Sequence, residues 1–192
     1  MTFQKYPIKI QIILGLIFSI LNILVSYATQ TLQWPFFMDM IFVYTGSFFG
    51  IPCGIIVGLG HSIWTIFFHH NFFYFFYSIC CITGVILTKI FVTRYEDFSW
   101  IRLALLFFIS TIIISLEGSI IYTTFFAEKV GDNENSTLMF LTYTLIMQNL
   151  GVQLSAFLAR LPVNLIDKAI AVFGGFGIFL FSRRLIKTYK NQ

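Results

Sequence analysis

Long apolar runs separated by short polar links constrain this chain more than any other feature of its sequence. The first run covers residues 10–28, close to the ~20 residues that a helix needs to cross ~30 Å of hydrocarbon. Of the 192 residues, 58% are hydrophobic and only 10% are charged, an apolar share above that of ordinary soluble domains. The sequence therefore predicts an all-α integral membrane protein with a single membrane domain over residues 1–192.

The first run has a second interpretation. Lys5 and Lys9 precede it and Ser26-Tyr27-Ala28 ends it, which imitates a secretory signal with a small-residue cleavage site. The run is long for a signal sequence, which favours a retained first span.

Six of the apolar runs are predicted to cross the membrane as a helical bundle. The second and third are short and meet at a Gly-Ile-Pro-Cys-Gly break at residues 50–54, which predicts a hairpin of two helices. The predicted spans cover residues 10–28, 36–49, 54–69, 72–92, 101–127 and 163–182.

The distribution of Lys and Arg predicts the place of the remaining apolar segment, residues 138–159. If this segment is an extra helix on the outer face, both termini are cytoplasmic, and only Lys129, Arg160 and Lys168 of the twelve basic residues lie outside. That arrangement follows the preference of Lys and Arg for the cytoplasmic side. The alternative is a chain of seven spans with a basic C-terminal end outside, which stays open because the charge rule is a tendency.

Ionisable and polar side chains are rare in the predicted spans, and each is a functional candidate because charge is unfavourable in hydrocarbon. Asp39 lies early in the second span, and Glu117 lies in the fifth with no basic residue three or four positions away. For Glu117 a purely structural hydrogen bond is the alternative, and for Lys168 a snorkelling interfacial charge. The candidates for a substrate site in the outer half are Trp34, Asp39, Glu117, Gln148, Asn149, Asn164 and Lys168.

Motifs for catalysis or metal binding do not stand out in the sequence. The three cysteines lie in apolar runs without a C-x-x-C pair, and the three histidines lack the further ligands that a metal site needs. A phosphate-binding glycine loop and a nucleophile motif are also missing from the sequence. We therefore expect a protein that is not an enzyme and that uses neither a metal nor a cofactor.

The first predicted span carries a stripe of small and polar residues. Its members recur at spacings of four, three and four positions, so they share one helix face. Such stripes allow two helices to approach closely, and we expect this one to contact a partner subunit; the alternative is another helix of the same chain. The stripe consists of Gly15, Ser19, Asn22 and Ser26.

Three segments together resemble one known family. They are Trp34-Pro35-Phe36-Phe37-Met38-Asp39 with the glycine-rich residues 50–58, the proline-led entry into the last span at Leu161-Pro162-Val163-Asn164, and the stripe of the first span. They are similar to features of the S components of energy-coupling factor (ECF) transporters, which are small six-helix membrane proteins that bind vitamins. Gly15 and Ser19 stand where that family often has an alanine-x-x-x-alanine pattern.

The resemblance implies a substrate-specific binding subunit of an importer. Such a subunit captures a vitamin-like small molecule at the outer face of a bacterial cytoplasmic membrane, and Tyr74 and Tyr122 are expected to stack on a flat ring. The implied partners are a transmembrane coupling subunit, contacted through the stripe, and two cytoplasmic ATPases. The alternative function is a membrane-embedded sensory or interaction module without transport activity.

Overall fold

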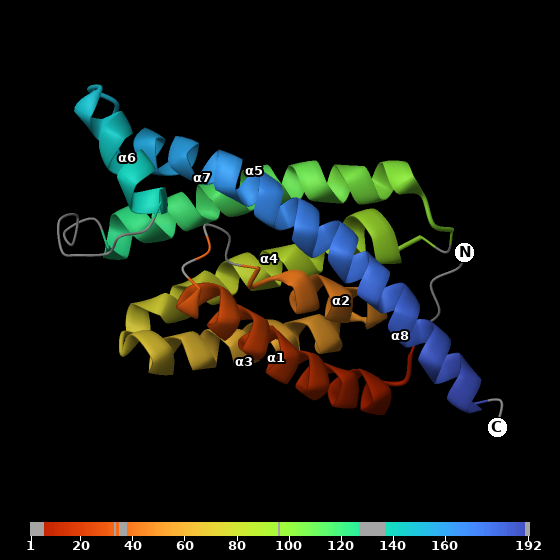
Figure 1. Ribbon diagram of the computed structural model, residues 1–192. Coiled ribbons are helices and arrows are strands. Elements are labelled where there is room, and N and C mark those ends of the chain that lie inside the picture. Colours follow the sequence, from red (N-terminus) through yellow and green to blue (C-terminus); the bar gives the residue numbers. More distant parts are fainter. Residues whose placement is uncertain (1–5, 33, 35–37, 96, 127–136, 191–192) are drawn as a thin grey trace.

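The computed structural model describes residues 6–32, 34, 38–95, 97–126 and 137–190, and these are mostly helical (Figure 1). A short 3-10 helix, Phe72–Tyr77, leads into α4, and π-helical turns at Lys89–Thr93 and Ile170–Gly174 follow α4 and join α7 to α8. The prediction of an all-α fold is therefore confirmed for this part of the chain. The helices are α1 (Ile8–Thr31), α2 (Ile41–Phe49), α3 (Ile51–His69), α4 (Ser78–Thr88), α5 (Trp100–Phe125), α6 (Thr137–Met147), α7 (Val152–Ala169) and α8 (Gly175–Lys190).

Five helical stretches among the described residues are long and apolar enough to cross a membrane. They are Ile8–Thr31, Ile51–His69, Phe72–Thr93, Trp100–Phe125 and Val152–Ile186. Four of them match the predicted spans 10–28, 54–69, 72–92 and 101–127 closely. The chain is thus a helical membrane protein by length and composition of its helices.

The helix in the predicted second span, residues 36–49, is shorter than expected. Residues 36 and 37 lie outside the described residues, and Met38, Asp39 and Met40 are not helical. The helix α2 has nine residues, about 13 Å at the rise of an α-helix, which is too short to cross a bilayer alone. All residues from Phe42 to Phe49 are buried, so α2 occupies the middle of the bundle.

The last predicted span begins earlier than expected. The break lies not at Pro162 but at Gln148–Gly151, where Asn149 takes a left-handed backbone conformation (φ 63°) and ends α6. From Val152 the helix continues through Pro162 and the π turn into α8, so the expected outer-face helix 138–159 is instead α6 plus the first turns of α7. A proline removes one backbone hydrogen bond, and here the rest of the long helix tolerates that loss.

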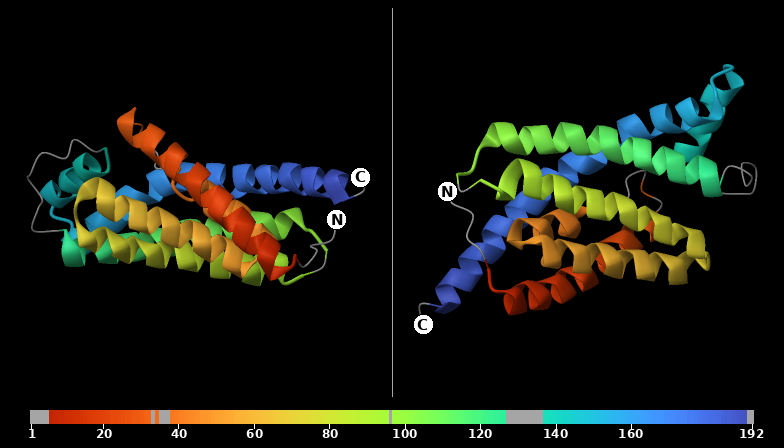
Figure 2. Two further views of the ribbon diagram at one scale, coloured as in Figure 1. Left: turned by 90° about the horizontal axis from the view of Figure 1, so that it is seen from below. Right: turned by 180° about the vertical axis from the view of Figure 1, so that it is seen from behind.

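The helices run between two ends of the bundle (Figures 1 and 2). The start of α1 and the end of α8 lie at one end, and α6 lies at the opposite end, called the far end below. Both α1 and α3 run toward the far end, so the chain between Thr31 and Ile51 returns through the bundle. The helix α2 contacts α1, α3, α4 and α8 on this return path.

Two glycines of α8, Gly175 and Gly177, differ in how closely α2 approaches them. A Cβ atom added at Gly175 would lie 2.8 Å from the Ile41 carbonyl oxygen and 3.2 Å from the Thr45 nitrogen, whereas one at Gly177 would meet nothing within 4 Å. Gly175→Ala is therefore expected to destabilise the protein by about 1–3 kcal/mol through overpacking. Thermal unfolding in detergent should show a lower Tm.

Gly177→Ala is the control, because both positions gain the same helix propensity, up to about 1 kcal/mol. Its Tm should be unchanged or slightly higher. Equal Tm values for the two variants would contradict the close packing of α2 on α8.

Candidate functional site

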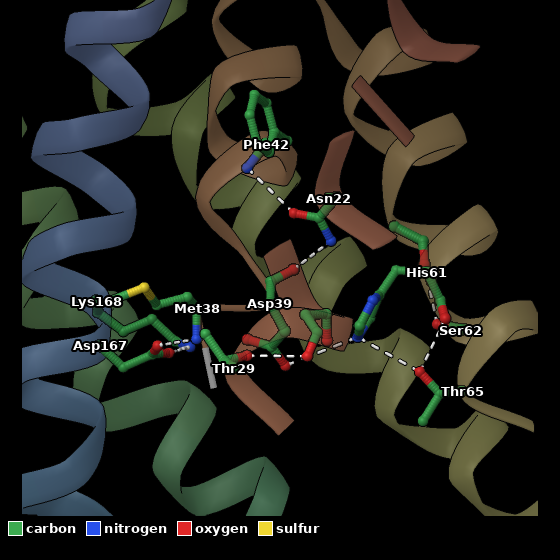
Figure 3. A network of polar contacts seen from close by, with 12 residues as sticks. Asn22, Thr29, Met38, Asp39, Phe42, His61, Ser62, Thr65, Asp167 and Lys168 are labelled. Atoms are coloured by element: carbon green, nitrogen blue, oxygen red, sulfur yellow. Dashed lines mark hydrogen bonds and ion pairs between the residues drawn. The ribbon is translucent and has the colours of Figure 1, made fainter. Parts of the chain in front are cut away.

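Asn22 of α1 binds the backbone at the start of α2 (Figure 3). Its Nδ2 donates to the Asp39 carbonyl oxygen at 2.6 Å, and its Oδ1 accepts from the Phe42 nitrogen at 3.2 Å. The Asn22 side chain is fully buried. It therefore supplies the partners that a continued helix would have given to these two backbone groups.

The non-helical residues Met38–Met40 are called the break before α2 below, and the position of Asn22 gives its depth in the bundle. Asn22 lies nine residues before the end of α1 at Thr31, or about 13 Å along the helix axis. His61, which faces the same break, lies eight residues before the end of α3 at His69, or about 12 Å. The non-helical residues before α2 are thus well inside the bundle and not at its rim.

Asp167 of α7 holds the other side of the break. Its Oδ1 accepts a hydrogen bond from the Met38 nitrogen at 2.8 Å, and its Oδ2 accepts one from Lys168 Nζ at 2.6 Å. Met38 has a left-handed backbone conformation (φ 47°), which points its N–H at this carboxylate. Both charged side chains are buried, so each needs the other as its counter-charge.

Asp39 and His61 form the more open part of this cluster. The Asp39 carboxylate oxygen lies 4.0 Å from His61 Nε2, and the Asp39 side chain is 33% exposed while His61 is buried. The second carboxylate oxygen, Oδ1, and His61 Nδ1 are buried without a hydrogen-bond partner among the described residues. Asp39 therefore has acceptor capacity that the described residues do not use.

A second row of polar contacts joins α5 to the part of α7 nearer the far end. Asn164 Nδ2 donates to Ser115 Oγ at 2.9 Å, and Gln153 Nε2 donates to Ser119 Oγ at 3.1 Å. Between them lies Arg160, which is buried; its Nη1 donates to the Ala156 carbonyl oxygen, and its guanidinium carbon lies 4.6 Å from the centre of the Tyr122 ring. The inward face of α7 thus carries polar groups along its length.

The structure brings three of the seven expected site residues to this inward region. Asp39 lies beside the Asp167–Lys168 pair, and Asn164 lies one turn from Lys168 on α7. Glu117 faces α4 instead, where Thr83 Oγ1 donates to it at 2.6 Å, as the structural alternative predicts. Trp34 is 52% exposed, and Gln148 and Asn149 are exposed in the link between α6 and α7.

The sequence did not indicate a binding role for four buried polar residues of this region. Asn22 was assigned only to a partner contact, while His61, Asp167 and Arg160 were not assigned to the site. Arg160, Asn164 and Lys168 recur at four-residue spacing, which would have placed them on one face of a continuous helix. A helix start at Pro162, as the sequence predicts, separates Arg160 from the other two.

The small-residue stripe of α1 packs inside the chain. Gly15, Ser19, Asn22 and Ser26 are all buried. A Cβ atom at Gly15 would lie 3.0 Å from Ile56 Cβ of α3, and one added at Gly60 of α3 would collide with Ser19. The stripe therefore contacts α3 and the start of α2, which is the alternative to a contact with a partner subunit.

The described residues were compared with the requirements of a metal site, and the chain with known proteins. Among the described residues, no group of three or more His, Cys, Asp or Glu side chains is placed to hold a metal ion. No protein-family model matches the chain, and comparisons with curated proteins and with solved structures also give no match. Among the described residues, the side chains of the site offer hydrogen-bonding groups and charges.

Removing the side chain that holds the break should destabilise the fold. Asn22→Leu keeps the approximate size but leaves the Asp39 carbonyl and the Phe42 N–H unpaired, at an expected cost of about 1–3 kcal/mol. Ser26→Ala on the same face is the control, because Ser26 Oγ has no hydrogen-bond partner among the described residues. Thermal unfolding should show a lower Tm for Asn22→Leu only, and an equally large loss in Ser26→Ala would argue against the capping role.

Because Asp167 and Lys168 form a buried ion pair, the losses of stability on replacing each of them should not add up in the double variant. Lys168→Met leaves the Asp167 carboxylate buried without its cation, which is expected to cost about 3–5 kcal/mol. In Asp167→Asn/Lys168→Met, the neutral amide can still accept from the Met38 N–H, so most of the stability should return. Tm values for both single variants and the double variant test this, and simple additivity would contradict a coupled pair.

Proposed function

We propose that this chain is the substrate-binding subunit of an ECF-type importer and captures a small, vitamin-like molecule at the outer face of the membrane. The observation that carries the proposal is the polar cluster of Asn22, Asp39, His61, Asp167 and Lys168, which surrounds the non-helical residues before α2 inside the bundle. Irregular backbone at membrane depth is tolerated where protein surrounds it or where it lines a cavity, and broken helices mark solute sites in many transporters.

The path of the chain supports six crossings with both termini in the cytoplasm. Five long helices make an odd number of passes, yet α1 starts and α8 ends at the same end of the bundle (Figure 1). In the proposed topology the chain between Thr31 and Ile51, including α2, makes the sixth pass. The end with Lys9, Arg183 and Arg184 is then cytoplasmic, as the distribution of basic residues favours, and the far end is the outer face.

The proposed partners are a transmembrane coupling subunit and two cytoplasmic ATPases. In the proposed importer the two ATPases supply the energy for uptake, and the coupling subunit links them to this chain. The α1 stripe packs inward, so the coupling subunit would contact the opposite face of α1, the least buried of the long helices. That face is apolar and includes Ile13, Leu16, Ile20 and Leu24.

Purification tests the proposal directly. We expect the chain isolated in mild detergent from its own cells to carry a small molecule and to co-purify with two ATPases, both identified by mass spectrometry. Asp39→Asn should lower the occupancy of that molecule at least ~10-fold, the loss of one hydrogen bond to a charged group, while the ATPases remain bound.

Glu117→Gln serves as the control, because Glu117 points toward Thr83 of α4 and should leave occupancy unchanged. A preparation that lacks both the small molecule and the ATPases but contains a kinase or cyclase would reject uptake in favour of a sensory module.

A further inference from the structure

We propose that the captured molecule carries a carboxylate or phosphate group, and that Arg160 binds this group beside Tyr77 and Tyr122. The inference rests on the proposed function, since it names the chemical class of the solute. It starts from a buried cation whose charge the described residues do not balance.

Arg160 is only 6% exposed and lies eight residues into α7, about 12 Å along the helix from Val152. A guanidinium has five N–H donors and is always charged. The described residues give it the Ala156 carbonyl oxygen at 3.1 Å and the Tyr77 hydroxyl. Among those residues, no Asp or Glu lies within ion-pair distance of Arg160. Donors and a full positive charge therefore remain for another group.

Lys168 provides a comparison within the same helix. It lies eight positions after Arg160 on the inward face of α7 and is equally buried. Asp167 pairs with it at 2.6 Å. The chain thus neutralises one buried cation of α7 with its own carboxylate, whereas the described residues leave the other to stacking and neutral acceptors. A buried charge is costly unless it is paired or hydrogen-bonded, and no carboxylate among the described residues pairs with Arg160; an anionic solute would supply that counter-charge.

The surroundings of Arg160 suit a planar anion. The Tyr122 ring covers one face of the guanidinium at 4.6 Å, which fixes its plane while leaving its edge for hydrogen bonds. One turn before Tyr122 on α5, Gly118 lets the Arg160 side chain lie close to the helix: a Cβ atom at Gly118 would lie 3.4 Å from Arg160 Nε. A guanidinium held in this way favours two parallel N–H···O bonds to a carboxylate or phosphate.

Matched neutral and anionic probes test the inference on the full-length protein in a neutral detergent. Benzoate and benzamide share size and ring but differ in charge, and inorganic phosphate adds a second anion. We expect benzoate or phosphate at millimolar concentration to raise Tm by several degrees, since a ligand that binds only the folded state stabilises it. Benzamide should shift Tm much less.

Two substitutions assign the effect to Arg160. Arg160→Gln should abolish the anion response, and without a ligand it should keep or raise Tm, because it removes an unbalanced buried charge. Arg160→Lys should keep a weaker response to the anions, and it replaces Arg160→Gln in the test if that variant does not fold. Arg183→Gln, on α8 at the opposite end of the bundle, is the control and should respond to anions as the wild type does.

Equal shifts with benzoate and benzamide, no shift with either anion, or a full response in Arg160→Gln would overturn the inference. Phosphatidylglycerol, added as a fourth probe, separates a lipid headgroup from a solute, and a response to this lipid alone would overturn binding of a captured solute. An anion response at Arg160 without co-purifying ATPases would reject the importer but keep the anion site. Co-purifying ATPases without an anion response would reject the anion site but keep the importer.

Discussion

The structure depends on one constraint of the membrane interior: backbone N–H and C=O groups that leave a helix there need other partners from the protein. Residues 38–40, before α2, are not helical although they lie well below the far end of α1, and two side chains from distant helices supply partners to the backbone there. Asn22 bonds the Asp39 carbonyl and the Phe42 N–H, and Asp167 bonds the Met38 N–H. Lys168 then balances Asp167, and His61 lies beside Asp39, so the polar cluster follows from the break in the helix.

Much of this fold could be predicted because hydropathy reports how long each apolar helix is, whereas the cluster depends on contacts across the fold. The four spans 10–28, 54–69, 72–92 and 101–127 needed only run length. The short α2 could not be predicted from run length, because it depends on side chains that lie 17 and 129 residues away from the backbone groups they bind. Asp39, Asn164 and Lys168 were expected because charge and amides are rare in spans, and that reasoning is independent of helix boundaries.

The errors at α7 have a local cause. Pro162 predicts a helix start, since proline is favoured in the first turn, but a long helix can lose one hydrogen bond and continue. That boundary placed Arg160 in a water-exposed link, where a cation needs no partner. Once the helix is continuous, Arg160 is buried and its charge requires an explanation.

The position of α1 connects the cluster to the outside of the bundle. One face of this helix carries the stripe, in which Asn22 is bonded to the Asp39 carbonyl and the Phe42 N–H, and the opposite face exposes Ile13, Leu16, Ile20 and Leu24. A helix transmits displacement from one face to the other because its backbone hydrogen bonds make it stiff over these distances. In the proposed importer, a ligand that moves Asp39 would therefore move α1 through Asn22. The apolar face proposed to meet the coupling subunit would shift with it, and the stripe would then act in coupling from inside the chain.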